Sequence, residues 1–133
     1  MAEPRHETVD QLLAAARDGV ERLEPTQAHA AAGDRAILVD IRSDSQRSAD
    51  GLIPSAIHVP RNVLEWRCDP ASDHRDERLS RRDRPIVLIC NEGYQSSLAA
   101  AALRRFGLDA TDVVGGFQAW RTEGLPVAGP RPR

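Results

Sequence analysis

The 133-residue chain contains no lysine, so all 18 of its basic side chains are arginines. Twenty acidic residues bring the formal net charge to −2 and the isoelectric point to about 6.1. The chain therefore lacks the overall basic field that gathers nucleic acid or an anionic membrane surface. No apolar run approaches the roughly 20 residues that span a bilayer. We expect neither nucleic acid nor membrane among its partners.

Targeting and metal-binding patterns are scarce as well. The polar start "MAEPRHETVD" lacks the basic region and apolar core of a signal peptide, which predicts a cytoplasmic protein. Cys68 and Cys90 form no CxxC pair and no disulfide framework. The four histidines are scattered at no metal-ligand spacing. We expect no metal and no cofactor.

Apolar runs alternate with helical patterns along the chain. "AILVD" (36–40) and "PIVLIC" (85–90) are nearly continuous, which is typical of strands buried on both faces. This alternation predicts an α/β fold with a parallel sheet and helices on both faces. We expect further strands at 20–23, 56–60 and 111–116, helices at 8–20, 25–33, 61–66, 95–107 and 117–124, and loops at 41–55 and 67–84, with at most one helical turn in the former.

The length suits one domain. We expect a disordered N-terminus over residues 1–7 and a single domain over 8–127. Within that domain, residues 8–20 form a helix that precedes the core. The proline-rich residues 128–133 are predicted to be a flexible tail.

The stretch "CNEGYQSS" (90–97) joins a predicted strand to a predicted helix. Ligands of an open parallel sheet sit beyond the carboxyl ends of its strands, which is where Cys90 falls. Gly93 lets the backbone curl, and the free N–H groups at a helix start bind anions. A thiol placed there has a lowered pKa and is a nucleophile. Position alone fits an inert buried cysteine equally well.

Four motifs resemble the rhodanese family and occur in that family's order over roughly residues 24–127. "CNEGYQSSLAAAAL" is similar to its active-site segment Cys-x-x-Gly-x-Arg-Ser with an alanine-rich helix. "LVDIR" (38–42), "GLIPSAIHVP" (51–60) and "VVGGFQAWRTEGLPV" (113–127) resemble the other three. The resemblance implies a three-layer α/β domain with a five-stranded parallel sheet.

The resemblance also implies sulfur transfer. In that family a cysteine thiolate takes the sulfane sulfur of a donor, thiosulfate or a persulfide, and the resulting persulfide passes it to a thiol or to cyanide. Carried over, Cys90 is the nucleophile and the carrier. The substrate-binding positions are Asn91, Glu92, Gly93, Tyr94, Gln95 and Ser96, whose backbone N–H groups surround the outer sulfur, together with Arg42. Asp40 is a supporting residue.

Two positions in the loop depart from the family pattern. Gln95 replaces the usual arginine, and Glu92 adds a carboxylate. Two charges about 6 Å apart interact by roughly 3 kcal/mol at an effective dielectric near 20. Glu92 therefore weakens a dianionic donor strongly if it points at the sulfur and only slightly if it points to solvent. We expect thiosulfate to be a poorer donor than a neutral or cationic persulfide.

Several further residues have two interpretations each. Arg61 and Arg67 supply the missing positive charge or are plain surface arginines, and Arg42 lies at the rim of the site or pairs on the surface with Asp44 or Glu92. Ser96 and Ser97 cap the helix or place a hydroxyl near the sulfur. Trp66 is expected to pack in the core and Tyr94 to face solvent. Cys68 is expected in a charged loop, with little support for a role as a resolving thiol.

Two other functions compete with sulfur transfer. The related phosphatases use a Cys-x5-Arg loop, but the sixth residue after Cys90 is Ser96 and the loop holds no arginine. Phosphatase activity is therefore not expected. A non-catalytic module for sulfur relay or protein binding stays open, because the lost arginine favours it while the retained Cys90 opposes it.

Overall fold

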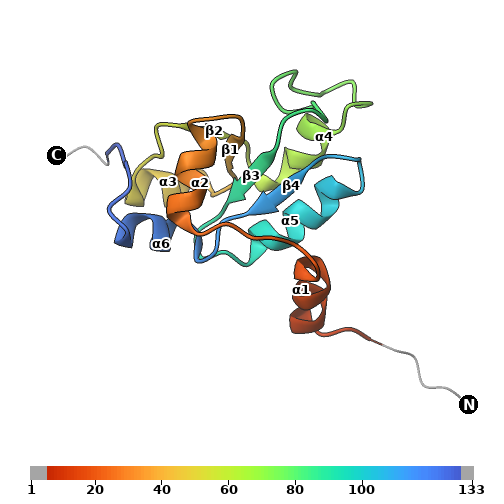
Figure 1. Cartoon of the computed structure of the whole chain (residues 1–133), viewed down its shortest axis with the longest axis horizontal. Helices are drawn as coiled ribbons and strands as arrows, with labels where there is room; N and C mark the ends of the chain where they lie inside the picture. The colour runs from red at the N-terminus through yellow and green to blue at the C-terminus, as the bar shows by residue number, and fades with distance from the viewer. Residues whose placement is uncertain (1–5, 130–133) are drawn as a thin grey trace, which may run out of the picture.

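A computed structural model describes residues 6–129. Four parallel strands, β1 (Ile37–Asp40), β2 (Ala56–His58), β3 (Ile86–Ile89) and β4 (Ala110–Asp112), form one sheet in the order β2-β1-β3-β4. Helices flank the sheet on both sides (Figure 1). The predicted α/β class with a parallel sheet is confirmed.

The sheet has four strands within residues 6–129, whereas the resemblance implied five. In the expected edge strand at 20–23, only Leu23 pairs, in an isolated bridge to Val113. Leu23 donates to the Asp112 carbonyl and accepts from the Val114 N–H at 3.0 and 2.9 Å. The chain leaves the sheet at once, because Pro25 opens the next helix and helical dihedrals cannot continue a strand.

Side chains of the strands alternate between two core clusters, one on each face. Ile37 and Val39 pack with α4 (Leu64–Cys68) and α5 (Gln95–Arg104). Leu38 and Val87 pack on the other face with α2 (Pro25–Ala32) and α6 (Gly116–Thr122). Both faces are covered, which is why the strands read as continuous apolar runs.

The first helix, α1 (Val9–Arg17), lies outside the layers, beside α5 (Figure 1). It begins with a capping box, in which the Thr8 side chain accepts from the Gln11 N–H and the Gln11 side chain accepts from the Thr8 N–H. Ala16 is buried, and the Arg104 guanidinium of α5 donates to its carbonyl at 2.6 Å. The chain ahead of the sheet is thereby fixed to the core.

Residues 41–55 contain more structure than predicted. The seven-residue helix α3 (Asp44–Asp50) replaces the expected loop with one helical turn. Its capping box joins Ser43 to Gln46, a spacing that the sequence does show. The prediction missed the helix because none of its residues is buried, so it carries no apolar stripe.

The other boundaries shift modestly. The helix expected at 61–66 is present as a 3₁₀ turn, η1 (Arg61–Val63), followed by α4. The strand expected at 111–116 ends at Asp112, four residues early. Ala128, in the predicted tail, still pairs with Leu52 through two 2.8 Å hydrogen bonds. The rest of that tail (130–133) and most of the predicted disordered start (1–5) lie outside the described residues.

Two side chains lie differently from expectation. Trp66 is 57% exposed rather than packed in the core. Cys68 is the last residue of α4 and fully buried, not part of a charged loop. Among residues 6–129, no helix has both the length and the apolar character that crossing a bilayer requires.

Candidate active site

Cys90 lies directly after β3, at the carboxyl edge of the sheet. The backbone N–H groups of Gly93 and Ser96 point at its Sγ, at 3.2 and 3.4 Å. Gly93 has φ +87°, a conformation that permits this turn and that residues with a Cβ rarely adopt. The positive end of the ten-residue helix α5 also faces the sulfur. The arrangement suits a negatively charged sulfur.

Cys90 opens into a hollow of about 200 Å³. The hollow brings together most of the residues that the sequence assigned to the site, and its lining is Arg42, Gln46, Cys90, Asn91, Glu92, Tyr94 and Gln95. Tyr94, Glu92 and Gln95 are exposed, as predicted for Tyr94. The Glu92 carboxylate therefore lies in solvent, the arrangement with the smaller electrostatic penalty.

The start of α6 holds the carbonyl groups of the loop away from the sulfur. The N–H of Phe117 donates to the Cys90 carbonyl at 2.8 Å, and that of Gln118 donates to the Asn91 carbonyl at 3.1 Å. Gly116, at φ +58°, allows this approach, because a Cβ there would lie 2.5 Å from the Cys90 oxygen. The Gly-Gly-Phe motif is thus a support for the loop.

Ser96 and Ser97 do not cap α5, contrary to one interpretation of the sequence. The N-cap residue is Tyr94, and no side chain caps the helix. Both hydroxyls instead donate to the buried Asp112 carboxylate at the end of β4, at 2.7 and 2.8 Å. The Ser96 Oγ also lies 3.2 Å from the Cys90 Sγ. A hydroxyl near the sulfur, the other interpretation, is what the structure contains.

Two arginines from the N-terminal segment complete this cluster. Arg22 binds both oxygens of Asp112, at 2.8 and 3.0 Å. Arg17 donates to Ser97 Oγ at 2.9 Å, and both guanidiniums donate to the Gly93 carbonyl, at 2.7 and 2.9 Å. Sequence reasoning missed Arg17, Arg22 and Asp112. The predicted strand ran on to residue 116, so Asp112 did not stand at a predicted strand end.

Arg42 lines the Cys90 hollow and forms no surface pair with Asp44 or Glu92. Its side chain is fully buried, and its Nε and Nη2 bind the Asp40 carboxylate at 2.8 to 3.2 Å. It also donates to the Gly51 carbonyl at 2.9 Å and stacks on the Phe117 ring. Asp40 additionally accepts from the Arg42 N–H. A substrate contact by Arg42 remains a prediction, and its Nη1, which is buried without a hydrogen-bond partner, is the atom available for it.

Comparison with known proteins identifies the family of this chain. The family model described as rhodanese-like domain matches residues 24–123. The chain belongs to the rhodanese-like family. A relative named thiosulfate sulfurtransferase GlpE, from Pseudomonas syringae, is 36% identical over 103 residues, which are 77% of this chain and 88% of the relative. A relative named sulfurtransferase, from Allochromatium vinosum, is 32% identical over 95 residues, 71% and 79% of the two chains.

A solved structure superposes on nearly the whole chain. It is a protein of unknown function from Rhodopseudomonas palustris, described as a possible tyrosine phosphatase. The two structures superpose with a TM-score of 0.84 at 30% identity, over 96% of this chain and 98% of the other. The family model begins at residue 24, so the alignment over 96% of this chain includes much of the segment before it.

Most other charged and nucleophilic groups of this rhodanese-like domain are engaged elsewhere. Arg61 lines a second hollow of about 470 Å³ that adjoins the Cys90 hollow at Gln95, but its guanidinium binds Glu65 at 2.7 Å. Arg67 donates to the His74 carbonyl. Burial, with Asp76 and Glu65 nearby, raises the pKa of the Cys68 thiol to about 12. Cys68 is therefore neutral and unsuited to a resolving role.

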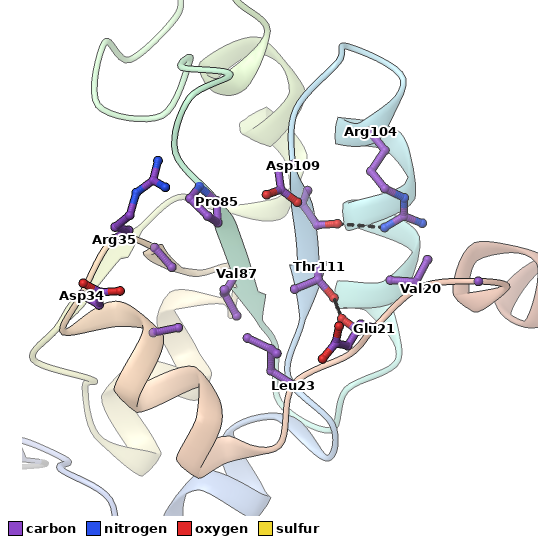
Figure 2. A pocket seen from close by; sticks show the side chains of 14 residues that line it. Val20, Glu21, Leu23, Asp34, Arg35, Pro85, Val87, Arg104, Asp109 and Thr111 are labelled. Carbon is purple, nitrogen blue, oxygen red and sulfur yellow. Dashed lines mark hydrogen bonds between the residues drawn. The ribbon is translucent and has the colours of Figure 1, made fainter.

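A third hollow, of about 550 Å³, opens at the amino ends of the strands (Figure 2). Pro85 and Asp109 stand at those ends, and Val20, Glu21 and Leu23 form its wall from the N-terminal segment. This is the edge away from Cys90. Within residues 6–129, no cluster of three or more His, Cys, Asp or Glu side chains has a geometry that would hold a metal ion.

Proposed function

We propose that the protein is a sulfurtransferase that carries a sulfane sulfur on Cys90. The donor is a persulfide or thiosulfate, and the acceptor is a thiol or cyanide. The observation that carries the proposal is the pair of backbone N–H groups, from Gly93 and Ser96, directed at the Cys90 Sγ at a helix start. Relatives named sulfurtransferase support it.

The reaction has two displacements in which atoms and electrons balance. The Cys90 thiolate attacks the outer sulfur of thiosulfate, the sulfur–sulfur bond of the donor breaks, and sulfite leaves with the bonding electrons. Cyanide or an acceptor thiolate then attacks the terminal sulfur of the Cys90 persulfide. The persulfide bond breaks, its electrons return to Cys90, and thiocyanate or a new persulfide departs. The transfer needs no external oxidant or reductant.

The loop accommodates the transferred sulfur through its backbone. Negative charge moves from the Sγ of Cys90 to the terminal sulfur when the persulfide forms. The N–H groups of residues 91–96 line the turn that would hold the terminal sulfur. The loop contains no arginine, so these backbone groups are its means of stabilising the negative charge. Preorganised donors of this kind stabilise developing charge without reorganising during the reaction.

The donor preference follows from the charges around the hollow. Gln95 contributes no charge, and the exposed Glu92 contributes a screened negative one. The adjoining 470 Å³ hollow, with Ser43, Asn62 and Arg61 in its lining, offers polar room for a donor longer than thiosulfate. We therefore propose that a low-molecular-weight organic persulfide is a better donor than thiosulfate. A cytoplasmic location and the lack of a cofactor remain predictions of the sequence.

Mass spectrometry of the intact protein tests the proposal. After incubation with thiosulfate or with glutathione persulfide, we expect the mass of one added sulfur, mapped to the peptide that contains Cys90. The Cys90→Ser variant should gain none, although it retains Cys68 as an internal control. The proposal would be contradicted if neither donor gave an adduct, or if the added sulfur were on Cys68.

Phosphatase activity is the second candidate, because the Rhodopseudomonas palustris structure is described as a possible tyrosine phosphatase. The geometry opposes it here. Ser96 occupies the position of the phosphate-binding arginine, and Arg17 and Arg22 bind the Gly93 carbonyl from beneath the loop. We expect no turnover of p-nitrophenyl phosphate above that of Cys90→Ser. A protein-binding module would form no Cys90 persulfide, whereas a sulfur-relay module would form it and pass the sulfur to a partner thiol faster than to cyanide.

A further inference from the structure

We propose that Arg17 and Arg22 are positioning residues that hold the Cys90 loop and supply positive charge beneath its sulfur. Both lie before residue 24, where the family match begins. They act from beneath the active-site loop and take over part of the role of the cation that the loop lacks. This inference builds on the proposed role of Cys90 and extends the working site into the N-terminal segment.

A chain of hydrogen bonds connects Arg22 to the sulfur. Arg22 binds Asp112 through both oxygens, Ser96 donates to Asp112 Oδ2 at 2.7 Å, and Ser96 Oγ lies 3.2 Å from Cys90 Sγ. Asp112 is buried, so its charge is poorly screened by water. An uncompensated carboxylate this close would disfavour a thiolate. The Arg22 guanidinium compensates that charge.

The Gly93 carbonyl is the second point of action. It accepts from Nη2 of Arg17 at 2.7 Å and from Nη2 of Arg22 at 2.9 Å. In a trans peptide, the carbonyl and the following N–H point in opposite directions. The Gly93 oxygen points at the two guanidiniums, so the Tyr94 N–H points to the opposite side of the loop, the side of the Cys90 hollow. Both arginines orient the backbone that faces the sulfur.

The segment that carries these arginines is anchored independently of the loop. Thr111 Oγ1 donates to the Glu21 carbonyl at 2.8 Å, as Figure 2 shows. Arg104 donates to the carbonyls of Ala16 and Ala110 at 2.6 and 3.0 Å. These anchors supply matched controls, because they bind the same segment without touching the Cys90 loop.

Charged groups approach Cys90 from every element around it. Arg17 and Arg22 come from the N-terminal segment, Asp112 from β4, the Asp40–Arg42 pair from the end of β1, and Glu92 from the loop itself. The Asp40–Arg42 pair is internally neutral, and Glu92 is exposed. Arg47 of α3 also lies 3.6 Å from Asp40. Arg17 and Arg22 are the cations that bind the Gly93 carbonyl of the Cys90 loop directly.

The rate of Cys90 alkylation by iodoacetamide, measured against pH on the full chain and resolved by peptide mass spectrometry, tests this inference. We expect Arg22→Gln to move the midpoint of the profile upward by about one pH unit. Arg17→Gln should shift it in the same direction by less, and Arg22→Lys should restore most of the wild-type midpoint. The matched control Arg104→Gln should keep the wild-type midpoint while lowering the melting temperature.

The outcomes separate positioning from mere support. Equal shifts in Arg22→Gln and Arg104→Gln, or no shift in either arginine variant, would overturn the inference. If Arg22→Gln does not fold, the Arg17→Gln and Arg22→Lys profiles decide the question by the same comparison. Alkylation does not involve sulfur transfer, so a failure of the proposed activity would leave these shifts intact and be recognised separately.

Discussion

Ser96 and Asp112 are joined by a 2.7 Å hydrogen bond directly beneath the Cys90 sulfur. A carboxylate can only accept hydrogen bonds, so the Ser96 hydroxyl donates its one proton to Asp112. Its oxygen is then free only to accept from the Cys90 thiol, 3.2 Å away. When the thiol loses its proton, the negative sulfur is left to the backbone N–H groups of Gly93 and Ser96.

The first prediction concerns the stability that Asp112 provides. Asp112→Asn removes the carboxylate from a buried cluster of two hydroxyls and a guanidinium, so we expect the free energy of unfolding to fall by about 3 kcal/mol. The control is Asp83→Asn, which breaks the exposed pair with Arg81 and should cost only a small fraction of that loss. Urea unfolding measures both. Equal losses would show that burial of the cluster has no special effect.

The second prediction tests the close approach of α6 to the loop. Gly116→Ala would place a Cβ 2.5 Å from the Cys90 carbonyl oxygen, so the loop must move. We expect Cys90 alkylation to slow at least about tenfold and stability to fall by more than about 2 kcal/mol. Gly124→Ala is the control, with a similar φ of +73° but no atom within 4 Å. It should cost about 1 kcal/mol and leave alkylation unchanged.

The third prediction concerns the two departures in the loop. Gln95→Arg returns a cation to the mouth of the hollow and should raise kcat/KM for thiosulfate about fivefold, a modest gain because position 95 is exposed. Glu92→Gln should raise it less than about threefold, because its carboxylate is screened. Thiocyanate formation is the measurement, with Glu77→Gln as a distant control. If Glu92→Gln raises kcat/KM for thiosulfate more than Gln95→Arg does, the Glu92 carboxylate lies close to the bound donor.

The fourth prediction uses the raised pKa of Cys68. The folded protein keeps this thiol protonated up to a pKa of about 12, while in the unfolded chain it ionises from its ordinary value of 9.0. The unfolded state binds fewer protons in this window, so the free energy of unfolding should fall with rising pH, by up to about 1.4 kcal/mol per unit from this group. Cys68→Ala should remove this contribution to the pH dependence of the free energy of unfolding between about pH 9 and pH 12.

Cys90→Ser is the control for the alkaline slope, and it should leave the Cys68 contribution in place. The absolute stability of Cys68→Ala will be lower because the substitution leaves a cavity, so the comparison concerns slopes only. An unchanged slope in Cys68→Ala would show that another group titrates in this range.

Much of the fold was predictable because it rests on local patterns. The apolar runs at 36–40 and 85–90 gave β1 and β3, and the spacing from Cys90 through Gly93 to Gln95 gave the loop and the start of α5. These features depend on neighbours within a few residues. The missed helix α3 depends on a capping box instead of an apolar stripe, a weaker signal.

The cluster under the loop was not predictable in the same way. Asp112 was missed because the predicted strand ran on to residue 116, which placed the strand end, and with it the sheet edge, four residues too late. Arg17 and Arg22 meet Gly93 across more than 70 positions of chain. Contacts over such separations depend on how α1 packs on α5, and no local pattern encodes that packing.

The location of the two arginines affects how this protein should be cut for study. An excised fragment spanning only residues 24–123 would retain Cys90, Ser96 and Asp112 but lose both guanidiniums that bind beneath them. Its thiol would face a buried carboxylate without a counter-ion. On the proposed role of the two arginines, we expect Cys90 to react more slowly in this fragment than in the whole chain, because the family boundary separates the arginines from the loop that they bind.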